Sequence, residues 1–344
     1  MGSRCTTQCG SRPCPRTAKS GLSASAQGFT RMTWNARLSW HQRAIIWVLR
    51  QGVIPRHAAI VPDGSRRYVK STGIGLGSAY DIMLQKIALI SIYMEAVGVE
   101  EVSYFVFSTR NFLRDTSEIN AVLSAAVRFC KATLSSLDSL QRRHLRVSVL
   151  GDVDLLPRQL QSNMAQVEIA TSNGSRKHTC RLCTAYSSKL SMNSTVLHMA
   201  NAVRAGVIKS DDVTAELIWD LFAQTEACET DLWYRSSGKQ CLIELLVLQS
   251  GYSYMHIGPQ LWPATGFWEF VSAILQFQLY WPYIQAVKER HRKLDDPSTD
   301  MDPAITIRQR MFLSSVKLWR MTYIGKFCSR KVLEENGCFP KNHL

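Results

Sequence analysis

The chain has 344 residues with a formal net charge of +14, and 46% of its residues are hydrophobic. This length and composition predict one large domain with extensions or two smaller domains, with enough apolar side chains for a sizeable core. The ten scattered cysteines exclude a small secreted disulfide scaffold and indicate a reducing compartment. The sequence contains no run of about 18 uncharged apolar residues that would predict a membrane-spanning helix. The basic balance favours an anionic partner.

Residues 1–31 contain no Asp or Glu and are rich in Ser, Thr, Arg and Cys, without apolar periodicity. We expect this N-terminal extension to be disordered, because it lacks the side chains of an apolar core. Two alternatives stay open. The segment has the Arg-rich, Ser-rich and acid-poor composition of a transit peptide, or the natural start of the protein is Met32.

Apolar side chains recur at helical spacing over residues 40–51, which predicts a helix. One face of this helix holds Trp40, Ala44, Trp47 and Val48. We expect the helix to pack on the domain. The alternative is a helix that lies on a membrane surface with its tryptophans as anchors.

Strand and helix patterns alternate over the rest of the chain, up to about residue 290. Predicted strands cover residues 58–61, 102–107, 146–150, 180–184 and 231–235, and predicted helices cover 81–97, 116–140, 155–171, 194–205, 212–222 and 267–290. Thr116 and the nearby carboxylate of Glu118 mark a helix start. The alternation predicts an α/β fold, a single domain with a mostly parallel central sheet flanked by helices.

Glycines at positions 73, 75 and 77 form a G-x-G-x-G pattern that needs an explanation. The Lys-Ser/Thr pair of a Walker loop and the ribose-binding acid of a dinucleotide site are both missing around it. We therefore predict a mobile loop here and not the phosphate-binding turn of a Rossmann fold.

The first polar cluster at a strand end reads Asp63-Gly64-Ser65-Arg66-Arg67 and is predicted to be a turn. Glycine lets the backbone approach a ligand, and the backbone N–H groups of such a turn can bind an anion. The two arginines can make bidentate contacts to phosphate. A carboxylate beside these cations suits phosphate binding if Mg²⁺ bridges them, since Mg²⁺ binds one or two carboxylates plus phosphate oxygens. The alternative is a surface turn with solvated arginines.

Two further polar clusters also follow predicted strands, where ligands bind in open parallel sheets. In residues 108–114, Asn111 offers a hydrogen-bond donor and an acceptor, and Arg114 offers a fork of donors. The third cluster stands at the end of a strand and reads Arg235-Ser236-Ser237-Gly238. Each cluster alone is a weak signal, but the three together predict one anion site at the strand ends.

The three clusters, in this order, resemble the cis-prenyltransferase family, also called undecaprenyl or dehydrodolichyl diphosphate synthases. The resemblance covers residues 32–278, and the stretches at 32–34 and 267–278 are similar to the eukaryotic dehydrodolichyl diphosphate synthase subunit. It implies the fold of that family, which is not a Rossmann fold. The matching stretches are His57 to Tyr68, Tyr104 to Phe112 and Asp231 to Gly238, with support from Val149 to Asp152 and Leu261 to Pro263.

The resemblance implies condensation of isopentenyl diphosphate with an allylic, farnesyl-type diphosphate, giving a long-chain cis-polyprenyl diphosphate for dolichol synthesis and protein glycosylation. It assigns Mg²⁺ binding and a catalytic role to Asp63, and assistance in the condensation to Asn111. It also implies apolar walls for the growing chain from helices near residues 81–97 and 116–130. Diphosphate binding is implied for Gly64, Ser65, Arg66, Arg67, Arg114, Arg235, Ser236 and Gly238.

The sequence departs from the family's pattern at several positions. Ser65 stands where the family usually has Asn, and the family's diphosphate-binding Arg and His fall on Leu76 and Tyr80. An Arg and a Ser that contact isopentenyl diphosphate fall on Cys241 and Ile243. Losing one charged phosphate contact costs about 1.5–3 kcal/mol. A catalytically weakened scaffold or regulatory subunit of a cis-prenyltransferase complex is therefore the alternative function.

The resemblance also implies a heteromer with a subunit of the Nogo-B receptor type, and a homodimer is the alternative. We expect peripheral association with the cytoplasmic face of the endoplasmic reticulum membrane, with a cytoplasmic location as the alternative. Nucleic acid is not expected as a partner, because no basic stripe with interleaved aromatic residues appears. The cis-prenyltransferase domain is expected over residues 32–290, followed by a linker and C-terminal helical tail over residues 291–344.

Overall fold

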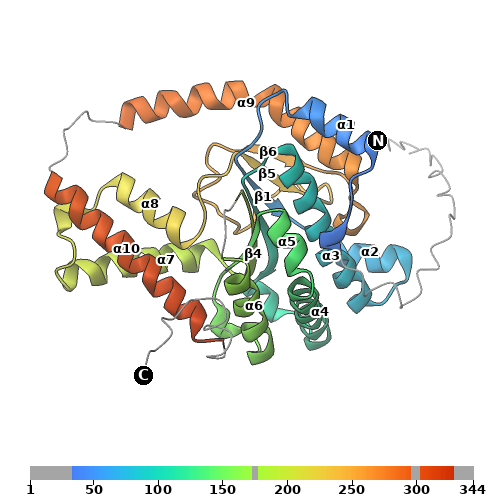
Figure 1. Cartoon of the computed structure of the whole chain (residues 1–344), viewed down its shortest axis with the longest axis horizontal. Coiled ribbons are helices and arrows are strands. Elements are labelled where there is room, and N and C mark those ends of the chain that lie inside the picture. Colours follow the sequence, from blue (N-terminus) through green and yellow to red (C-terminus); the bar gives the residue numbers. More distant parts are fainter. Residues whose placement is uncertain (1–32, 173–176, 296–302, 329–344) are drawn as a thin grey trace, which may run out of the picture. The chain divides into compact units, whose positions relative to one another are not determined.

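The central element of the fold is a sheet of six strands, all paired in parallel, in the order β3-β4-β2-β1-β5-β6 (Figure 1). The computed structural model describes residues 33–172, 177–295 and 303–328. The parallel sheet confirms the predicted α/β class with helices around a central sheet. The strands are β1 (His57–Val61), β2 (Glu101–Ser108), β3 (Leu145–Leu150), β4 (His178–Tyr186), β5 (Leu232–Arg235) and β6 (Tyr254–Ile257).

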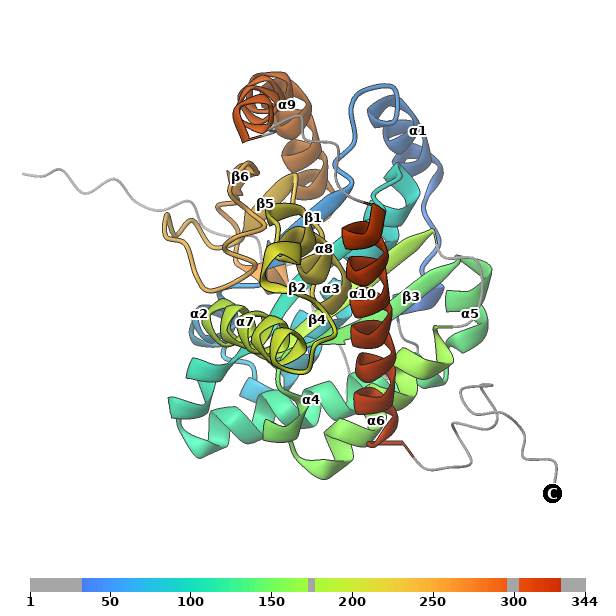
Figure 2. The same cartoon turned by 90° about the vertical axis from the view of Figure 1, so that its left-hand side faces the viewer.

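The helices flank this sheet (Figures 1 and 2). The α-helices in the described ranges are α1 (Trp40–Leu49), α2 (Ser65–Thr72), α3 (Leu76–Val97), α4 (Thr116–Leu134), α5 (Leu137–Arg142), α6 (Arg158–Ala170), α7 (Ser188–Arg204), α8 (Ala215–Thr225), α9 (Phe267–Asp295) and α10 (Pro303–Gly325). Short 3-10 helices are η2 (Thr33–Asn35), η3 (Thr109–Leu113), η4 (Val153–Leu155), η5 (Ser210–Asp212) and η6 (Trp262–Ala264).

The two faces of the sheet pack against different groups of side chains, because successive residues of a strand point to opposite faces. In β1, Ala58 and Ile60 belong to the large core cluster that also contains buried side chains of α3, α4 and α9. Ala59 and Val61 belong to a smaller cluster with Leu245 and other side chains of the opposite face. Strand β1 is buried on both faces, which explains why its sequence is a continuous apolar run from Ala58 to Val61.

The predicted turn at residues 63–67 is only partly a turn. Gly64 alone adopts the left-handed conformation, with φ +112°, and helix α2 begins at Ser65. A Cβ atom at Gly64 would lie 2.8 Å from Leu261 Cδ2, so this position has no room for a side chain. The chain thus passes from β1 into a helix, and the two arginines stand in its first turn. The predicted loop of glycines ends early, because α3 already begins at Leu76.

Two further element predictions need correction. The predicted helix over 116–140 breaks after Leu134 into α4 and α5. Ser135 and Ser136 stand at the break, and serine favours helix ends because its hydroxyl competes for backbone hydrogen bonds. Strand β6 is not predicted by the sequence at all, because it is short and its partly buried residues carry no apolar alternation.

Helix α1 packs on the domain as predicted, against α3 and α9. Its buried side chains are Ile46 and Leu49, so the face that carries Trp40 and Trp47 points outward. Trp40 is 77% exposed and Trp47 is 66% exposed. The expected packing is therefore confirmed, while the tryptophan face remains uncovered. No helix in the described parts of the chain is both long and apolar enough to cross a membrane.

The C-terminal part of the described chain consists of two long helices. Helix α9 runs to Asp295, beyond the predicted end at residue 290. Helix α10 contacts α6 and α8, and it buries Phe312, Leu313 and Val316 in an apolar cluster with side chains of α7 and α8. Residues 1–31, for which disorder is expected, lie outside the described residues.

Side chains at the end of α6 and on α10 bond to outward backbone groups of the edge strand β3. Thr171, just after α6, bonds both the N–H and the carbonyl of Val147. Glu168 of α6 accepts from the N–H of Val149, and Arg320 of α10 donates to the Val149 carbonyl at 2.8 Å. These backbone groups would otherwise be unpaired at the edge of the sheet.

Candidate active site

The predicted site residues lie at the carboxyl ends of three adjacent strands. Strand β1 lies between β2 and β5 in the sheet, and Val61 is in register with Arg235. Asp63 follows β1, η3 follows β2, and Arg235 is the last residue of β5. Because neighbouring parallel strands end on the same side of a sheet, the three polar clusters meet there.

Asp63 is the centre of the first group of contacts. Its Oδ2 accepts a hydrogen bond from Arg235 Nη2 at 2.8 Å and lies 3.7 Å from Arg67 Nη2. Burial by itself would raise the pKa of the Asp63 carboxyl, but the bond from Arg235 and the charges of Arg235 and Arg67 outweigh it and hold the pKa below its usual value. The carboxylate is therefore ionised at neutral pH.

The β1 and β5 clusters are also joined through their backbones. The Ser236 hydroxyl donates to the carbonyl of Asp63 and accepts from its N–H, both at 2.8 Å. Arg67 Nη1 donates to the carbonyl of Ser237 at 3.2 Å. Ser236 thus holds the two strand ends together, and its hydroxyl is occupied by these backbone bonds. Gly238, with φ +68°, donates its N–H to the carbonyl of Gly258 and turns the chain away from the site.

Four side-chain donors in this region are buried and make no hydrogen bond within the described residues: Ser65 Oγ, Arg67 Nη2, Arg235 Nε and Ser237 Oγ. Buried polar groups are normally hydrogen-bonded, so a group of four such donors needs an explanation. All four belong to the strand-end clusters, and two carry positive charge. They stand beside the N-terminus of α2, whose first N–H groups favour an anion. The arrangement fits an anionic ligand with several acceptor oxygens.

The β2 cluster contributes Asn111 and Arg114 on and after η3. Asn111 Oδ1 accepts from the Ser108 hydroxyl at 3.0 Å, which leaves its amide N–H₂ as the donor end. No hydrogen bond in the described part of the chain joins Asn111 to the other two clusters. Arg114 Nη1 donates to Glu118 Oε1 at 2.6 Å, and Arg66 Nε lies 3.8 Å from the same oxygen. Glu118 thereby links Arg66 of the first cluster to Arg114 of the second.

The residues at which the sequence departs from the family's pattern contact neighbouring side chains or backbone groups in the structure. Leu76 is partly buried against the large core cluster, and the Tyr80 hydroxyl donates to Glu118 Oε1 at 2.8 Å. Burial and the neighbouring Glu118 raise the pKa of Tyr80 well above its usual value, so this hydroxyl stays protonated. Ile243 packs on the smaller apolar cluster. Cys241 is exposed, and its carbonyl and Sγ lie 2.5 and 3.1 Å from Arg235 Nη1.

Sequence reasoning assigned Glu118 only to a helix start and missed its place in the site. The spacing of four residues between Arg114 and Glu118 was only a weak signal, because Arg114 has an extended backbone and precedes α4, so helical spacing does not bring the two side chains together. A second missed contact is the ion pair of Arg110 with Glu244, at 3.0 Å. Glu244 also accepts from the Ser187 hydroxyl.

A divalent metal here would have one protein carboxylate as its ligand. Among the described residues, no group of three or more His, Cys, Asp or Glu side chains could hold a metal ion by itself. Asp63 is ionised and stands beside donors that fit diphosphate oxygens. Mg²⁺ binds through one or two carboxylates plus substrate phosphates, so this donor set fits Mg²⁺ bound together with a diphosphate.

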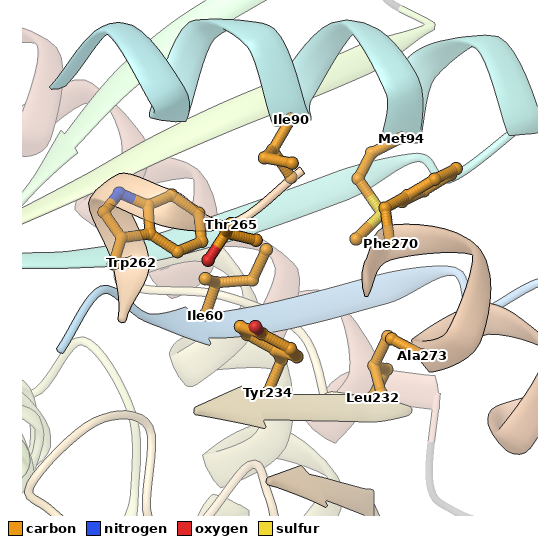
Figure 3. A pocket seen from close by; sticks show the side chains of 9 residues that line it. All are labelled: Ile60, Ile90, Met94, Leu232, Tyr234, Trp262, Thr265, Phe270 and Ala273. Carbon is orange, nitrogen blue, oxygen red and sulfur yellow. The ribbon is translucent and has the colours of Figure 1, made fainter. Parts of the chain in front are cut away.

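A small, partly open apolar pocket lies on the side of the sheet covered by α3 and α9 (Figure 3). Its volume of about 20 Å³ gives room for one water molecule. The side chains with polar atoms in its wall are Tyr234, Trp262 and Thr265, and no charged side chain lines it. Its lining comprises Ile60, Ile90, Met94, Leu232, Tyr234, Trp262, Thr265, Phe270 and Ala273.

The sequence matches a known family over most of the described chain. A model of the family described as putative undecaprenyl diphosphate synthase matches residues 61–280. The chain belongs to this family. The match spans all three polar clusters, from Asp63 to Gly238.

Curated members of this family are similar to the chain over much of its length. The human dehydrodolichyl diphosphate synthase complex subunit is 29% identical over 262 residues, which is 76% of this chain and 78% of that protein. The mouse subunit is 31% identical over 249 residues, covering 72% and 74% of the two chains. Dehydrodolichyl diphosphate synthase 4 of Arabidopsis thaliana is 28% identical over 233 residues, covering 67% and 79%.

A solved structure supports the fold. Lavandulyl diphosphate synthase from Lavandula x intermedia, in complex with dimethylallyl diphosphate, superimposes with a TM-score of 0.59 at 21% sequence identity. The superposition covers 65% of this chain and 95% of that one. At this identity the likeness establishes the shared fold, and it confirms the expected architecture of the cis-prenyltransferase domain.

Proposed function

We propose that this chain is a prenyltransferase that condenses isopentenyl diphosphate with an allylic, farnesyl-type diphosphate to make a long-chain cis-polyprenyl diphosphate for dolichol synthesis. The observation that carries the proposal is the group of buried donors without hydrogen bonds on Ser65, Arg67, Arg235 and Ser237, beside the Asp63 carboxylate. Family membership and the dehydrodolichyl diphosphate synthases among the relatives support this substrate class.

The three clusters divide the binding of two diphosphates between them. The N-terminus of α2 with Gly64, Ser65, Arg66 and Arg67 would bind the allylic diphosphate, and the side chains of Arg114 and Arg235, with the Ser236–Gly238 segment, the isopentenyl diphosphate. During the reaction the allylic C–O bond breaks and diphosphate leaves with the electron pair. The isopentenyl double bond attacks the allylic carbon, a carbon–carbon bond forms, and a proton is lost.

This site can lower the activation free energy mainly by stabilising the negative charge that develops on the leaving diphosphate, because preorganised cations stabilise such charge. Arg66 and Arg67 are placed to do so at the α2 N-terminus. Mg²⁺ held by Asp63 and the diphosphate would supply further neutralisation of the leaving group. Asn111 would stand between the two substrates with its amide as a donor. The growing chain would lie along the apolar side chains of α3 and α4.

Incorporation of labelled isopentenyl diphosphate into a farnesyl diphosphate primer tests the proposal. We expect a ladder of extended products from the wild type with Mg²⁺, and a loss of at least about 100-fold in rate for Asp63→Ala, since removal of a single electrostatic contact can cost that much. Asp154→Ala is the control and should keep the wild-type rate, because this half-exposed aspartate follows the edge strand β3, which β4 separates from the strands of the site. Absence of product in every condition would exclude the prenyltransferase function.

We further propose that the chain works as a subunit of a complex, with a Nogo-B-receptor-like subunit or with a second copy of itself. The human and mouse relatives are named as complex subunits, which supports a heteromer. The assay above, run with and without a co-expressed subunit of that type, distinguishes the two. Activity that appears only in the co-expressed sample supports the heteromer, and full activity of the chain alone supports the homodimer.

We also propose peripheral association with the cytoplasmic face of the endoplasmic reticulum membrane, where a polyprenyl product would be used in protein glycosylation. The exposed tryptophans of α1 support this location. Fractionation of cells that express the chain, with an alkaline carbonate wash, tests it. A peripheral protein leaves the membrane in the wash, and a chain found only in the soluble fraction would contradict the proposal.

A further inference from the structure

One carboxylate oxygen, Glu118 Oε1, is shared by three side chains from three parts of the chain. The Tyr80 hydroxyl of α3 donates to it at 2.8 Å, and Arg114 Nη1 donates to it at 2.6 Å. Arg66 Nε of α2 lies 3.8 Å from it. Glu118 itself is only 8% exposed. Its position in the first turn of α4 places this carboxylate at a helix N-terminus.

The partners of Glu118 explain how its carboxylate can be buried, since a buried carboxylate needs positive charge and hydrogen bonds to compensate for the loss of water. The helix N-terminus and two guanidinium groups compensate the negative charge, and the tyrosine hydroxyl adds a neutral donor. The three charged side chains have a formal sum of +1. The surplus charge leaves the cluster attractive to a diphosphate even while Glu118 is ionised.

Glu118 also holds the guanidinium groups of Arg66 and Arg114 near each other. Without its charge, two guanidinium groups within 4 Å of one point would repel each other and separate. Arg66 is contacted through Nε and Arg114 through Nη1, so nitrogens of both guanidinium groups remain for phosphate oxygens. Arg66 belongs to the cluster after β1, and Arg114 to the cluster after β2. Glu118 therefore joins one arginine from each of the two clusters.

We propose that Glu118 is a positioning residue that holds Arg66 and Arg114 at the separation needed to bind the two diphosphates, and that Tyr80 holds Glu118 in place. The inference rests on the proposed prenyltransferase function for the identity of the substrates. The alternative is that Glu118 competes with diphosphate for the two arginines. In that case the removal of its charge would strengthen diphosphate binding.

The experiment compares the full chain with Glu118→Gln, Glu118→Asp and Tyr80→Phe. Binding of inorganic diphosphate with Mg²⁺ is measured by calorimetry, and KM and kcat are measured for each substrate. We expect Glu118→Gln to weaken diphosphate binding and raise KM for isopentenyl diphosphate by about 10-fold or more, because a charged hydrogen bond is lost. The effect on kcat should be smaller. Glu118→Asp keeps the charge but shortens the side chain, so it should show an intermediate loss.

Glu95→Gln is the matched control, because Glu95 also pairs with an arginine, Arg143 at 3.1 Å, at the other end of α3. It should leave diphosphate binding unchanged. Tyr80→Phe keeps the ring and removes the hydroxyl, and we expect a loss of about 2- to 5-fold, in line with one neutral hydrogen bond. Thermal unfolding identifies variants that fail to fold. If Glu118→Gln does not fold, Glu118→Asp and Tyr80→Phe still decide the outcome.

Unchanged or tighter diphosphate binding in a folded Glu118→Gln, or in both other variants, would overturn the positioning role. That failure is distinct from failure of the proposed function. A wild type that binds inorganic diphosphate but forms no product contradicts the prenyltransferase reaction and leaves the binding comparison valid. A wild type that forms product while Glu118→Gln binds diphosphate equally well contradicts the positioning role alone.

Discussion

Arg235 links the Asp63 carboxylate to the segment that follows β5. Its Nη2 bonds Asp63, and its Nη1 bonds the Cys241 carbonyl. The resemblance to the family implies an arginine at the position of Cys241, which is uncharged in this chain. We therefore expect less positive charge beside Arg235 than the family's pattern would give.

An arginine at position 241 should restore part of that charge. Cys241 is exposed, so the longer side chain of Cys241→Arg has room and should not disturb folding. We expect KM for isopentenyl diphosphate to fall by about 10-fold, because a charged hydrogen bond to phosphate contributes about 1.5–3 kcal/mol. Cys241→Leu, an uncharged change at the same position, should leave KM unaltered. An unchanged KM in the arginine variant would show that this position does not face the substrate.

For individual residues, the sequence predicts that Asp63, Arg67 and Arg235 lie close together, because each follows or ends a strand of one parallel sheet. It does not predict that Glu118 joins Arg66 to Arg114. That contact depends on how α2, α3 and α4 pack together, and no pattern within one element contains this information. Ser236 is likewise predicted as a ligand from its motif, while its backbone bonds to Asp63 depend on strand register.

Helix α10 is attached to the domain by a buried ion pair as well as by apolar contacts. Arg320 Nη2 donates to Glu168 Oε1 and to the Val149 carbonyl, both at 2.8 Å. Burial alone would raise the pKa of Glu168, but the charges of Arg320 and Arg146 outweigh it and lower the pKa below its usual value. The pair therefore stabilises the folded chain with an ionised Glu168.

Removal of Arg320 should destabilise the domain. We expect Arg320→Met to reduce the free energy of unfolding by about 2–4 kcal/mol, because it leaves a buried carboxylate with less compensation. Lys326→Met, just after the end of the same helix, removes a half-exposed ion pair with Asp154 and should cost less than about 1 kcal/mol. Urea denaturation at neutral pH measures both, and equal costs would contradict a special role for Arg320.

The same variant has a predictable pH dependence. The contribution of Glu168 is complete above the usual glutamate pKa of 4.5 in the unfolded chain and is lost as the pH falls through the lower folded pKa. The difference between the wild type and Arg320→Met should therefore shrink at acid pH.

Elements with strong periodicity are predicted well from the sequence, and those decided by packing are not. β1, β2 and α3 carry continuous apolar or helical patterns, and the structure contains each of them near its predicted place. The outward face of α1 is not predictable in this way, since Trp40 and Ile46 are both apolar. Only the presence of α3 and α9 decides that Ile46 is buried.

The charge of the whole chain is unevenly distributed. Residues 1–62 contain no Asp or Glu, and α1 within this segment exposes Trp40 and Trp47. Positive charge together with exposed tryptophans suits an anionic membrane surface. This uneven distribution has a consequence for the proposed peripheral association, namely that the association should depend on salt.

Binding to vesicles tests that consequence. With vesicles of phosphatidylcholine and phosphatidylserine, we expect the bound fraction to fall as salt rises from about 0.05 to 0.5 M, because screening weakens attraction between exposed charges. The double change Trp40→Ser and Trp47→Ser should weaken binding by about 10-fold or more, since two apolar anchors are lost. Trp219→Ser, at an exposed tryptophan of α8, is the control. Equal binding of all three proteins would exclude α1 as the contact.

The side chains along β3 have a consequence for aggregation. A strand can add to a sheet edge only where backbone groups are unpaired. At β3 the outward N–H and carbonyl groups of Val147 and Val149 already bond Thr171, Glu168 and Arg320. A strand from another molecule would have to displace the buried ion pair of Arg320 and Glu168 before it could pair with β3. Addition of a strand from another molecule is therefore blocked along Val147 and Val149 at this edge of the sheet.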